Sequence, residues 1–242
     1  MVDNYSNSEE LLRSGSMTAL RLSSVGSNYT FFVNLEDAQG ACAVAVYKPI
    51  VGEAPLWDFP QGTLFKRECA SYLLSEALGW RLIPSTVIRD GPYGVGSVQL
   101  YVDHLANQHY FTLRDDYPVD LRKVCLFDVL TNNADRKASH FLLDRNSHVW
   151  AIDHGLTFHD EPKLRTVIWD FAAAPIPKDL IGDVAGLSKR FDQKGDAIVK
   201  LITQLISVGE LAALRDRIRL VLETAVYPFP DDSKRNIPWP LF

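Results

Sequence analysis

The stretch that decides the fold class is Asn132-Asn133-Ala134-Asp135-Arg136-Lys137-Ala138-Ser139-His140, followed after two short predicted strands by Ala151-Ile152-Asp153-His154-Gly155. The first part is a polar loop between a predicted helix, residues 119–132, and a predicted hairpin, residues 140–152. Asp153 comes directly after the second strand of that hairpin. Two carboxylates at the two ends of one hairpin are a common way to hold Mg²⁺, which prefers oxygen ligands and leaves other positions to water and phosphate.

A purely structural interpretation of each motif stays open. Asp135 and Arg136 can form a surface ion pair, and Asp153-His154-Gly155 can be an ordinary turn, because loops are normally polar. Chance produces both motifs at this spacing on one hairpin much less often than it produces either alone. We therefore predict a site for metal and phosphate here.

Three predicted strands precede this region, at residues 18–22, 29–35 and 41–47. They are rich in β-branched and aromatic residues and are separated by turn residues, which predicts an antiparallel meander. Lys48 ends the third strand, where a compact positive charge suits phosphate. The structural alternative is that Lys48 extends to solvent from the strand end.

A helix is predicted over residues 64–78, ending at Gly79. Glu68, early in this helix, is the carboxylate best placed to orient Lys48, and Glu76 is the weaker candidate. The structural alternative for Glu68 is a helix charge that faces solvent.

The turn between the first two strands contains small residues whose backbone N–H groups can approach phosphate oxygens. These are Ser24, Gly26, Ser27 and Asn28. Taken alone the turn is weak support, because any hairpin uses such residues.

The remaining predicted elements are strands at residues 86–89 and 97–102 and helices at 196–206 and 210–225. The chain thus has a β-rich half with one helix and an α-rich half with one small hairpin. We expect an α+β protein with two lobes, residues 1–102 and residues 103–242, and a cleft between them.

Composition bounds the class of protein. The chain has 242 residues, a net charge of −5 and 47% hydrophobic residues, which suits a packed core and excludes a disordered chain. The charge argues against nucleic acid as a partner, and the absence of a long apolar run argues against membrane insertion. With a polar N-terminus and three widely spaced cysteines, the expected location is the cytoplasm.

The order of serine- and glycine-rich turn, strand lysine, helix glutamate, Asp-Arg loop and Ile-Asp-His-Gly resembles the protein-kinase-like fold. The loop form Asn-x-Asp-Arg-x-x-x-His, followed by Ile-Asp-x-Gly-Leu-x-Phe, is closer to the HipA-like and phosphatidylinositol 4-kinase type II branches than to His-Arg-Asp protein kinases. Over nearly its whole length the chain resembles a bacterial family of phosphatidylinositol 3-/4-kinase-like proteins. The shared stretches are Pro55–Pro60, Arg67–Glu68, Leu78–Trp80, Arg89–Pro92, Asn133–Lys137 and Ile152–Gly155.

The resemblance implies an antiparallel-sheet N-lobe and a mainly helical C-lobe with ATP between them. It implies that Lys48 contacts the α- and β-phosphates and pairs with Glu68. Asp135 would accept the proton of an attacking hydroxyl, and Asp153 would hold Mg²⁺ or Mn²⁺.

The resemblance also assigns residues around these. Ser24, Gly26, Ser27 and Asn28 would cover the phosphates, and a connecting strand would meet the adenine through its backbone at Gln99, Tyr101 and Val102. Arg136 would brace the loop or neutralise developing charge, and Asp128 would anchor the loop from the preceding helix.

One departure concerns the second metal ligand. Relatives have Asn five residues after the catalytic Asp, and His140 occupies that place here. Neutral imidazole suits Mn²⁺ better than Mg²⁺. Three functions stay open: transfer of the γ-phosphoryl group of metal-bound ATP to an unknown hydroxyl acceptor, a nucleotide-binding pseudokinase that acts as a scaffold, and an AMP transferase. A protein or small-molecule acceptor is favoured over a lipid, because the sequence shows no basic membrane patch.

Overall fold

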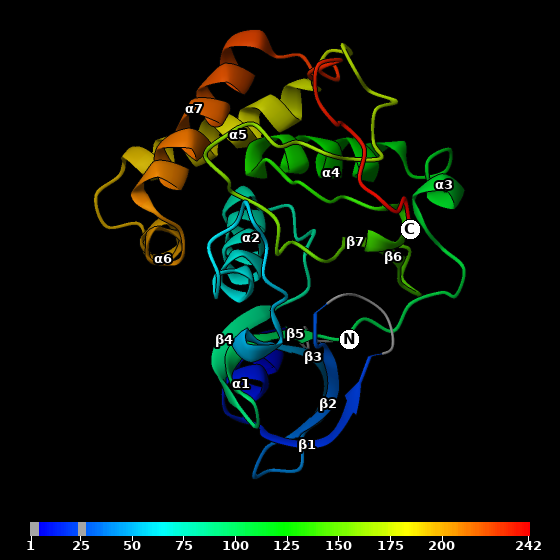
Figure 1. The fold of residues 1–242 in the computed structure, drawn as a ribbon, viewed down its shortest axis with the longest axis vertical. Coiled ribbons are helices and arrows are strands. Elements are labelled where there is room, and N and C mark those ends of the chain that lie inside the picture. The colour runs from blue at the N-terminus through cyan, green and yellow to red at the C-terminus, as the bar shows by residue number, and fades with distance from the viewer. Residues whose placement is uncertain (1–4, 24–27) are drawn as a thin grey trace.

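The computed structural model describes residues 5–23 and 28–242. Its N-terminal part is a five-stranded antiparallel sheet in the order β1-β2-β3-β5-β4 (Figure 1). The strands are β1 (Ser16–Leu22), β2 (Phe31–Glu36), β3 (Cys42–Pro49), β4 (Thr86–Gly91) and β5 (Gly94–Leu100). The predicted meander forms the first three strands, and the register places Lys48 opposite Ser97 of β5.

A small hydrophobic core lies between this sheet and helix α1 (Tyr5–Ser14). Leu11 and Leu12 of the helix pack against the alternating inward residues of the strands, such as Val33 and Leu35. No sequence pattern predicts α1, because its polar first half gives no helical period of apolar residues.

Helix α2 (Leu64–Leu78) has the predicted bounds and ends at Gly79, which adopts a left-handed conformation. The helix lies between the sheet and the C-terminal helices (Figure 1). Buried apolar residues from its second half, among them Leu74 and Leu78, belong to the large core of the C-terminal part. The helix thus connects the two lobes, although it precedes β4 and β5 in the chain.

The C-terminal part is mainly helical. It contains α3 (Tyr110–Leu113), α4 (Pro118–Thr131), α5 (Lys178–Asp192), α6 (Ala197–Leu205) and α7 (Val208–Thr224), with the hairpin of β6 (Phe141–Leu143) and β7 (Val149–Ala151). Short 3₁₀ helices occur at Ile50–Gly52 and Ala138–His140. Helix α5 was missed, although Leu180, Val184, Leu187 and Phe191 recur at helical spacing and are all buried.

The predicted two-lobed α+β architecture is therefore present. The lobe boundary at residues 102 and 103 stays a prediction. The last strand of the sheet ends at Leu100, and α3 begins at Tyr110.

The C-terminal residues 227–242 run as an extended segment along the helical lobe (Figure 1). Asn236 accepts a hydrogen bond from the N–H of Thr166, and Leu241 accepts one from Ala138. The tail therefore reaches the polar loop of residues 132–140.

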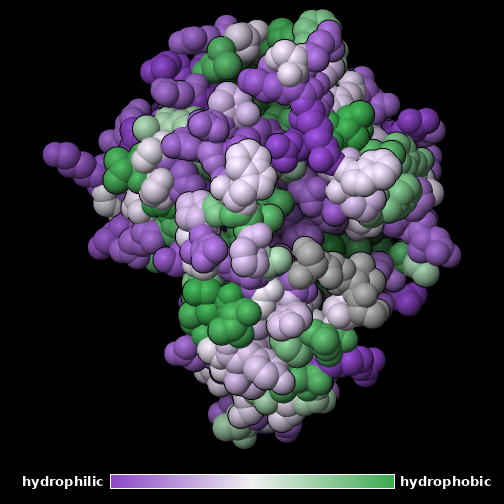
Figure 2. All heavy atoms as spheres, in the orientation of Figure 1, coloured by the Kyte–Doolittle hydropathy of each residue, from purple (hydrophilic) through white to green (hydrophobic). Residues whose placement is uncertain are grey.

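No helix among the described residues is long and apolar enough to cross a membrane. On the face seen in Figure 2, hydrophilic residues predominate over the helical lobe, and hydrophobic residues lie in separate groups.

Candidate active site

Three distant segments meet at the side chain of Lys48. From the end of β3, its Nζ forms an ion pair with Oε1 of Glu68 in α2 and lies 3.1 Å from Oδ1 of Asp153. Glu68 also accepts the backbone N–H of His154 through Oε2, at 3.0 Å. Burial lowers the pKa of Lys48, but the charges of Asp153 and Glu68 outweigh it, and the pKa lies above its ordinary value. Lys48 is therefore fixed as a cation.

Asp153 follows β7 and has a positive φ of 60°, in the left-handed region that non-glycine residues rarely adopt. Its side chain is half exposed. Lys48 holds the pKa of this carboxyl well below its usual range, so Asp153 is ionised at any ordinary pH. Backbone strain of this kind often marks functional sites.

Asp135 stands in the loop beside Lys137, with 3.3 Å between Oδ2 and Nζ. Burial, with a contribution from the charge of Asp153, raises the pKa of Asp135 to about 6. Its side chain keeps 27% of its surface exposed. The carboxyl is thus reachable and has a pKa suited to a general base near neutral pH.

A fully buried ion pair between Arg136 and Asp128 anchors the loop of residues 132–140 to α4. Arg136 donates through Nε and Nη2 to Asp128 of α4, and through Nη1 to the carbonyl of Ile152 at 2.8 Å. Its Nη2 also lies 2.6 Å from Nε2 of His154. Burial holds the pKa of His154 well below its ordinary value, so the ring is neutral and accepts this hydrogen bond. Of the two roles implied for Arg136, this position allows the bracing of the loop.

His140 lies on the other side of Asp153, with 3.4 Å between its Nε2 and Oδ2 of Asp153. Burial lowers the pKa of His140 to about 4, so the ring is neutral at pH 7. Nδ1 accepts the backbone N–H of Lys137 at 3.3 Å. A neutral imidazole with an accepting Nδ1 carries its proton on Nε2, which here faces Asp153. Metal binding through Nε2 would require the other tautomer.

The residues around Asp153 fit a metal ion that is coordinated mainly by the phosphates of a bound substrate and by water. Among the described residues no group of three His, Cys, Asp or Glu side chains surrounds one point. Mg²⁺ is commonly bound by one or two carboxylates together with substrate phosphates and water. The half-exposed carboxylate of Asp153 meets that requirement.

The predicted nucleotide-contacting residues have different positions. Ser24, Gly26 and Ser27 lie outside the described residues. Asn28 accepts the backbone N–H of Ala54 through its side-chain oxygen at 2.7 Å, which ties the end of the turn to the segment after β3.

The connecting strand is partly occupied by contacts within the protein. The side chain of Gln99 is buried and donates to Thr86, and the N–H of Tyr101 donates to the carbonyl of Val44. The N–H of Val102 has no hydrogen-bond partner among the described residues. A cavity of about 250 Å³ adjoins this segment, lined by Pro84, Leu100, Tyr101, Val102, Asp103, Asp144, Arg145, Asn146 and Trp150.

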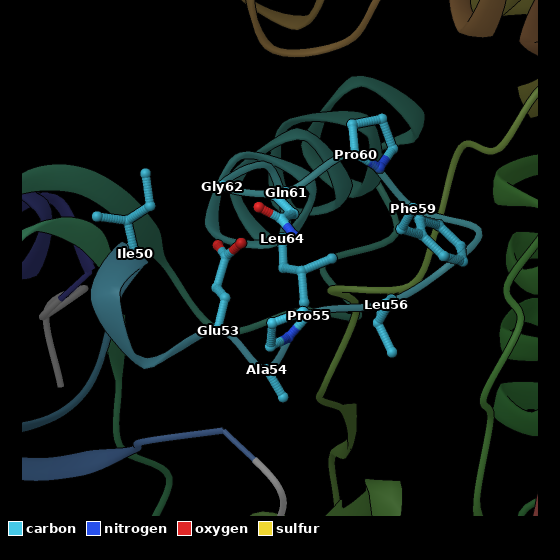
Figure 3. Close-up of a pocket in the computed structure, with 10 residues that line it drawn as sticks. All are labelled: Ile50, Glu53, Ala54, Pro55, Leu56, Phe59, Pro60, Gln61, Gly62 and Leu64. Carbon is cyan, nitrogen blue, oxygen red and sulfur yellow. The ribbon is translucent and has the colours of Figure 1, made fainter.

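A second cavity, of about 310 Å³, lies at the start of α2 (Figure 3). It is lined by Ile50, Glu53, Ala54, Pro55, Leu56, Phe59, Pro60, Gln61, Gly62 and Leu64. None of the ion-paired residues lines it. It borders the candidate site through Phe59 and Leu64, which pack against Ala134, the residue before Asp135.

Sequence reasoning missed a buried pair behind the site. Arg67 of α2 pairs with Glu210 of α7 and also donates to the carbonyl of Thr157. The Ser207-x-x-Glu210 spacing is recognisable as a capping box, which predicts a helix start but says nothing about a partner in α2.

The fold and the site define a protein-kinase-like molecule. Similar solved structures include the Golgi casein kinase with Mn/ADP bound, with a TM-score of 0.61 and 13% identity over 97% of this chain and 78% of that one. The structure of Hydra Fam20 with sugar has a TM-score of 0.57 and 14% identity over 98% and 93% of the two chains. The Helicobacter pylori proinflammatory kinase CtkA has a TM-score of 0.50 and 10% identity over 89% and 94%. At these identities the likeness concerns the fold alone.

Sequence comparison specifies the family. Residues 85–189 match the family model described as phosphatidylinositol 3- and 4-kinase. The chain is 37% identical to the protein Rv2133c of Mycobacterium tuberculosis, over 96% of this chain and 94% of that protein. It is 27% identical to phosphatidylinositol 4-kinase gamma 4 of rice, Oryza sativa subsp. japonica, over 61% of this chain but only 32% of the rice protein. The chain belongs to the same family as Rv2133c, and its residues 85–189 resemble phosphatidylinositol 3- and 4-kinases.

Proposed function

We propose that this protein transfers the γ-phosphoryl group of metal-bound ATP to the hydroxyl of an acceptor, a protein or a small molecule. The observation that carries the proposal is the convergence of Lys48, Glu68 and Asp153 from three segments. The charge of Asp153 also acts on the carboxyl of Asp135, which has a pKa of about 6. A cation, an always-ionised carboxylate and a general base are the parts that phosphoryl transfer needs.

In this proposal each side chain has one role. Lys48, held by Glu68, binds phosphate oxygens of ATP, and Asp153 is the residue that would hold a divalent metal. A bound Mg²⁺ or Mn²⁺ would neutralise charge on the phosphates. Asp135 accepts the proton of the acceptor hydroxyl as its oxygen attacks the γ-phosphorus of ATP. The bond from that phosphorus to the β–γ bridging oxygen breaks, and ADP leaves. Catalysis comes mainly from positioning and charge neutralisation.

The base of the nucleotide is proposed to lie against the connecting segment after β5. The N–H of Val102, which has no hydrogen-bond partner within residues 5–23 and 28–242, and the cavity beside Tyr101 support this position. Gln99 contributes packing within the sheet, because its side chain is bonded to Thr86.

A second candidate function is a nucleotide-binding pseudokinase. His140, whose accepting Nδ1 leaves its Nε2 protonated, favours this candidate, because a protonated Nε2 is no metal ligand. A pseudokinase would show ATP-dependent thermal stabilisation with no release or transfer of phosphate in either Mg²⁺ or Mn²⁺.

The deciding experiment uses γ-labelled ATP with each metal and follows labelled products by mass spectrometry. Added phosphate supports the proposal, and added AMP with pyrophosphate release would replace it with AMP transfer. Asp135→Ala should abolish transfer and leave nucleotide binding largely intact. Asp153→Ala should weaken metal-dependent binding itself, and wild-type affinity in that variant would contradict its metal role.

A further inference from the structure

Arg67 precedes Glu68 in α2, about 100° further round the helix. Its side chain is almost completely buried, with 2% of its surface exposed. The guanidinium has three partners: Nη2 pairs with Glu210 of α7, Nη1 donates to the carbonyl of Thr157 in a loop of the C-lobe, and Nε lies 3.3 Å from Oγ1 of Thr63, the N-cap of α2 itself. One residue of α2 thus faces the proposed active site and its neighbour fastens the same turn to the C-lobe.

The partners of Arg67 are themselves fixed. Glu210 is part of the capping box of α7, and its Oε2 accepts the N–H of Ser207 at 2.7 Å while Oε1 meets Arg67. Thr157 lies four residues after Asp153, and its hydroxyl donates to the carbonyl of His154 at 2.7 Å. The same hydroxyl lies 3.2 Å from the hydroxyl of Ser71, one turn after Arg67.

A buried arginine–glutamate pair is a costly way to gain stability, because both charges lose their water. A helix turns as a rigid unit, so any rotation or shift of α2 that moves Glu68 away from Lys48 must also break the contacts of Arg67 with Glu210 and Thr157.

We propose that Arg67 and Glu210 are positioning residues that lock the rotation of α2 and hold Glu68 at Lys48 before any ligand binds. Neither residue is among those proposed to bind ATP, the metal or the acceptor. The effect on turnover rests on the proposed function, whereas the effect on Lys48 can be measured in the ligand-free protein.

The test compares Arg67→Met and Glu210→Gln with Ser207→Ala. Glutamine keeps the capping contact to Ser207, because capping boxes accept Gln, but it loses the charge that pairs with Arg67. Ser207→Ala removes a capping hydrogen bond of the same helix and leaves the Arg67–Glu210 pair in place, so it is the matched control for stability.

The first measurement is trace acetylation of Lys48 at one fixed pH, read by mass spectrometry. The second is amide hydrogen exchange of residues 64–78 and of His154, whose N–H is bonded to Glu68. We call Arg67→Met and Glu210→Gln the lock variants. We expect both to raise the rate of Lys48 acetylation and the rate of amide exchange in α2 by about tenfold, and we expect Ser207→Ala to stay within about twofold of wild type. Arg67→Lys, which keeps the charge, should recover part of the difference.

Folded lock variants with wild-type Lys48 labelling and wild-type exchange in α2 would overturn the inference. If Arg67→Met does not fold, Glu210→Gln and Arg67→Lys decide the matter by the same two measurements. Faster Lys48 acetylation in the variants of a protein that transfers no phosphate would support the positioning role of Arg67 and Glu210 and refute the proposed function. Transfer with an unchanged kcat in variants whose Lys48 is loosened would refute its link to turnover.

Discussion

Arg136 and Asp128 form an ion pair in which neither side chain has exposed surface, with 3.0 Å between Nη2 and Oδ1. Asp128 belongs to α4, eight residues before Arg136 in the polar loop, and it also accepts the side-chain N–H of Asn133 at 2.9 Å. The helix thereby fixes the loop, while Asp135, which lies between these two donors in the sequence, keeps 27% of its side-chain surface exposed.

Removal of Asp128 should therefore be a stability mutation. Asp128→Ala leaves the guanidinium of Arg136 buried with a lost partner, which typically lowers the free energy of unfolding by about 3–5 kcal/mol. Urea denaturation measures it. The control is Asp103→Ala, which breaks the exposed pair with Arg145 and should change little. A similar effect in both variants would contradict the anchoring role of Asp128.

The rate of transfer should depend on pH through Asp135. Its pKa of about 6, raised chiefly by burial, means that the general base is protonated and inactive at lower pH. We expect kcat/KM to fall about tenfold per pH unit below about 6 and to be level above it, because free Asp135 must be ionised. A profile with no break between pH 5 and 7 would exclude Asp135 as the base.

The raised pKa of Asp135 also predicts that the protein becomes more stable when Asp135 is replaced by asparagine. The pKa of Asp135 in the folded protein lies above the ordinary value of 3.8. The folded protein therefore holds this proton more tightly than the unfolded chain does. As the pH rises through about 6 and Asp135 ionises, the free energy of unfolding falls. Asp135→Asn should raise the free energy of unfolding at pH 7 by about 1–3 kcal/mol, a gain that disappears below about pH 4.

Asp153→Asn is the control, because it should lower the stability at pH 7, whereas Asp135→Asn should raise it. Lys48 holds the pKa of Asp153 far below its ordinary value, so ionised Asp153 stabilises the fold at pH 7 and its amide should be less stable. Thermal unfolding at pH 4 and pH 7 distinguishes the two variants, and equal shifts of the same sign would refute this account.

His140→Asn tests the metal preference. An amide oxygen suits Mg²⁺, whereas imidazole suits softer ions such as Mn²⁺. If His140 is a ligand, the ratio of the rates in Mn²⁺ and Mg²⁺ should fall about tenfold in the variant. An unchanged ratio would mean that His140 is not a metal ligand and only lies beside Asp153, with 3.4 Å between its Nε2 and Oδ2 of Asp153.

Local sequence signals predicted the elements that carry the site. Helix α2 was bounded correctly because Leu64 begins an apolar helical stripe and Gly79 supplies the left-handed residue that ends it. The alternation of the first strands and the loop around Asp135 likewise depend on neighbours within a few residues. Helix α1 lacked such a signal, and the signal in α5 was overlooked.

The sequence by itself determined the two-lobed α+β class, the family resemblance, and the residue types of the site, because periodicity, turn chemistry and motif spacing are local properties. Only the tertiary structure decided that Lys48 meets both Glu68 and Asp153, that Arg136 is enclosed by Asp128 and His154, and that Arg67 reaches Glu210. These contacts join residues up to 143 positions apart, and the packing of α2 against both lobes sets them, which no local pattern encodes.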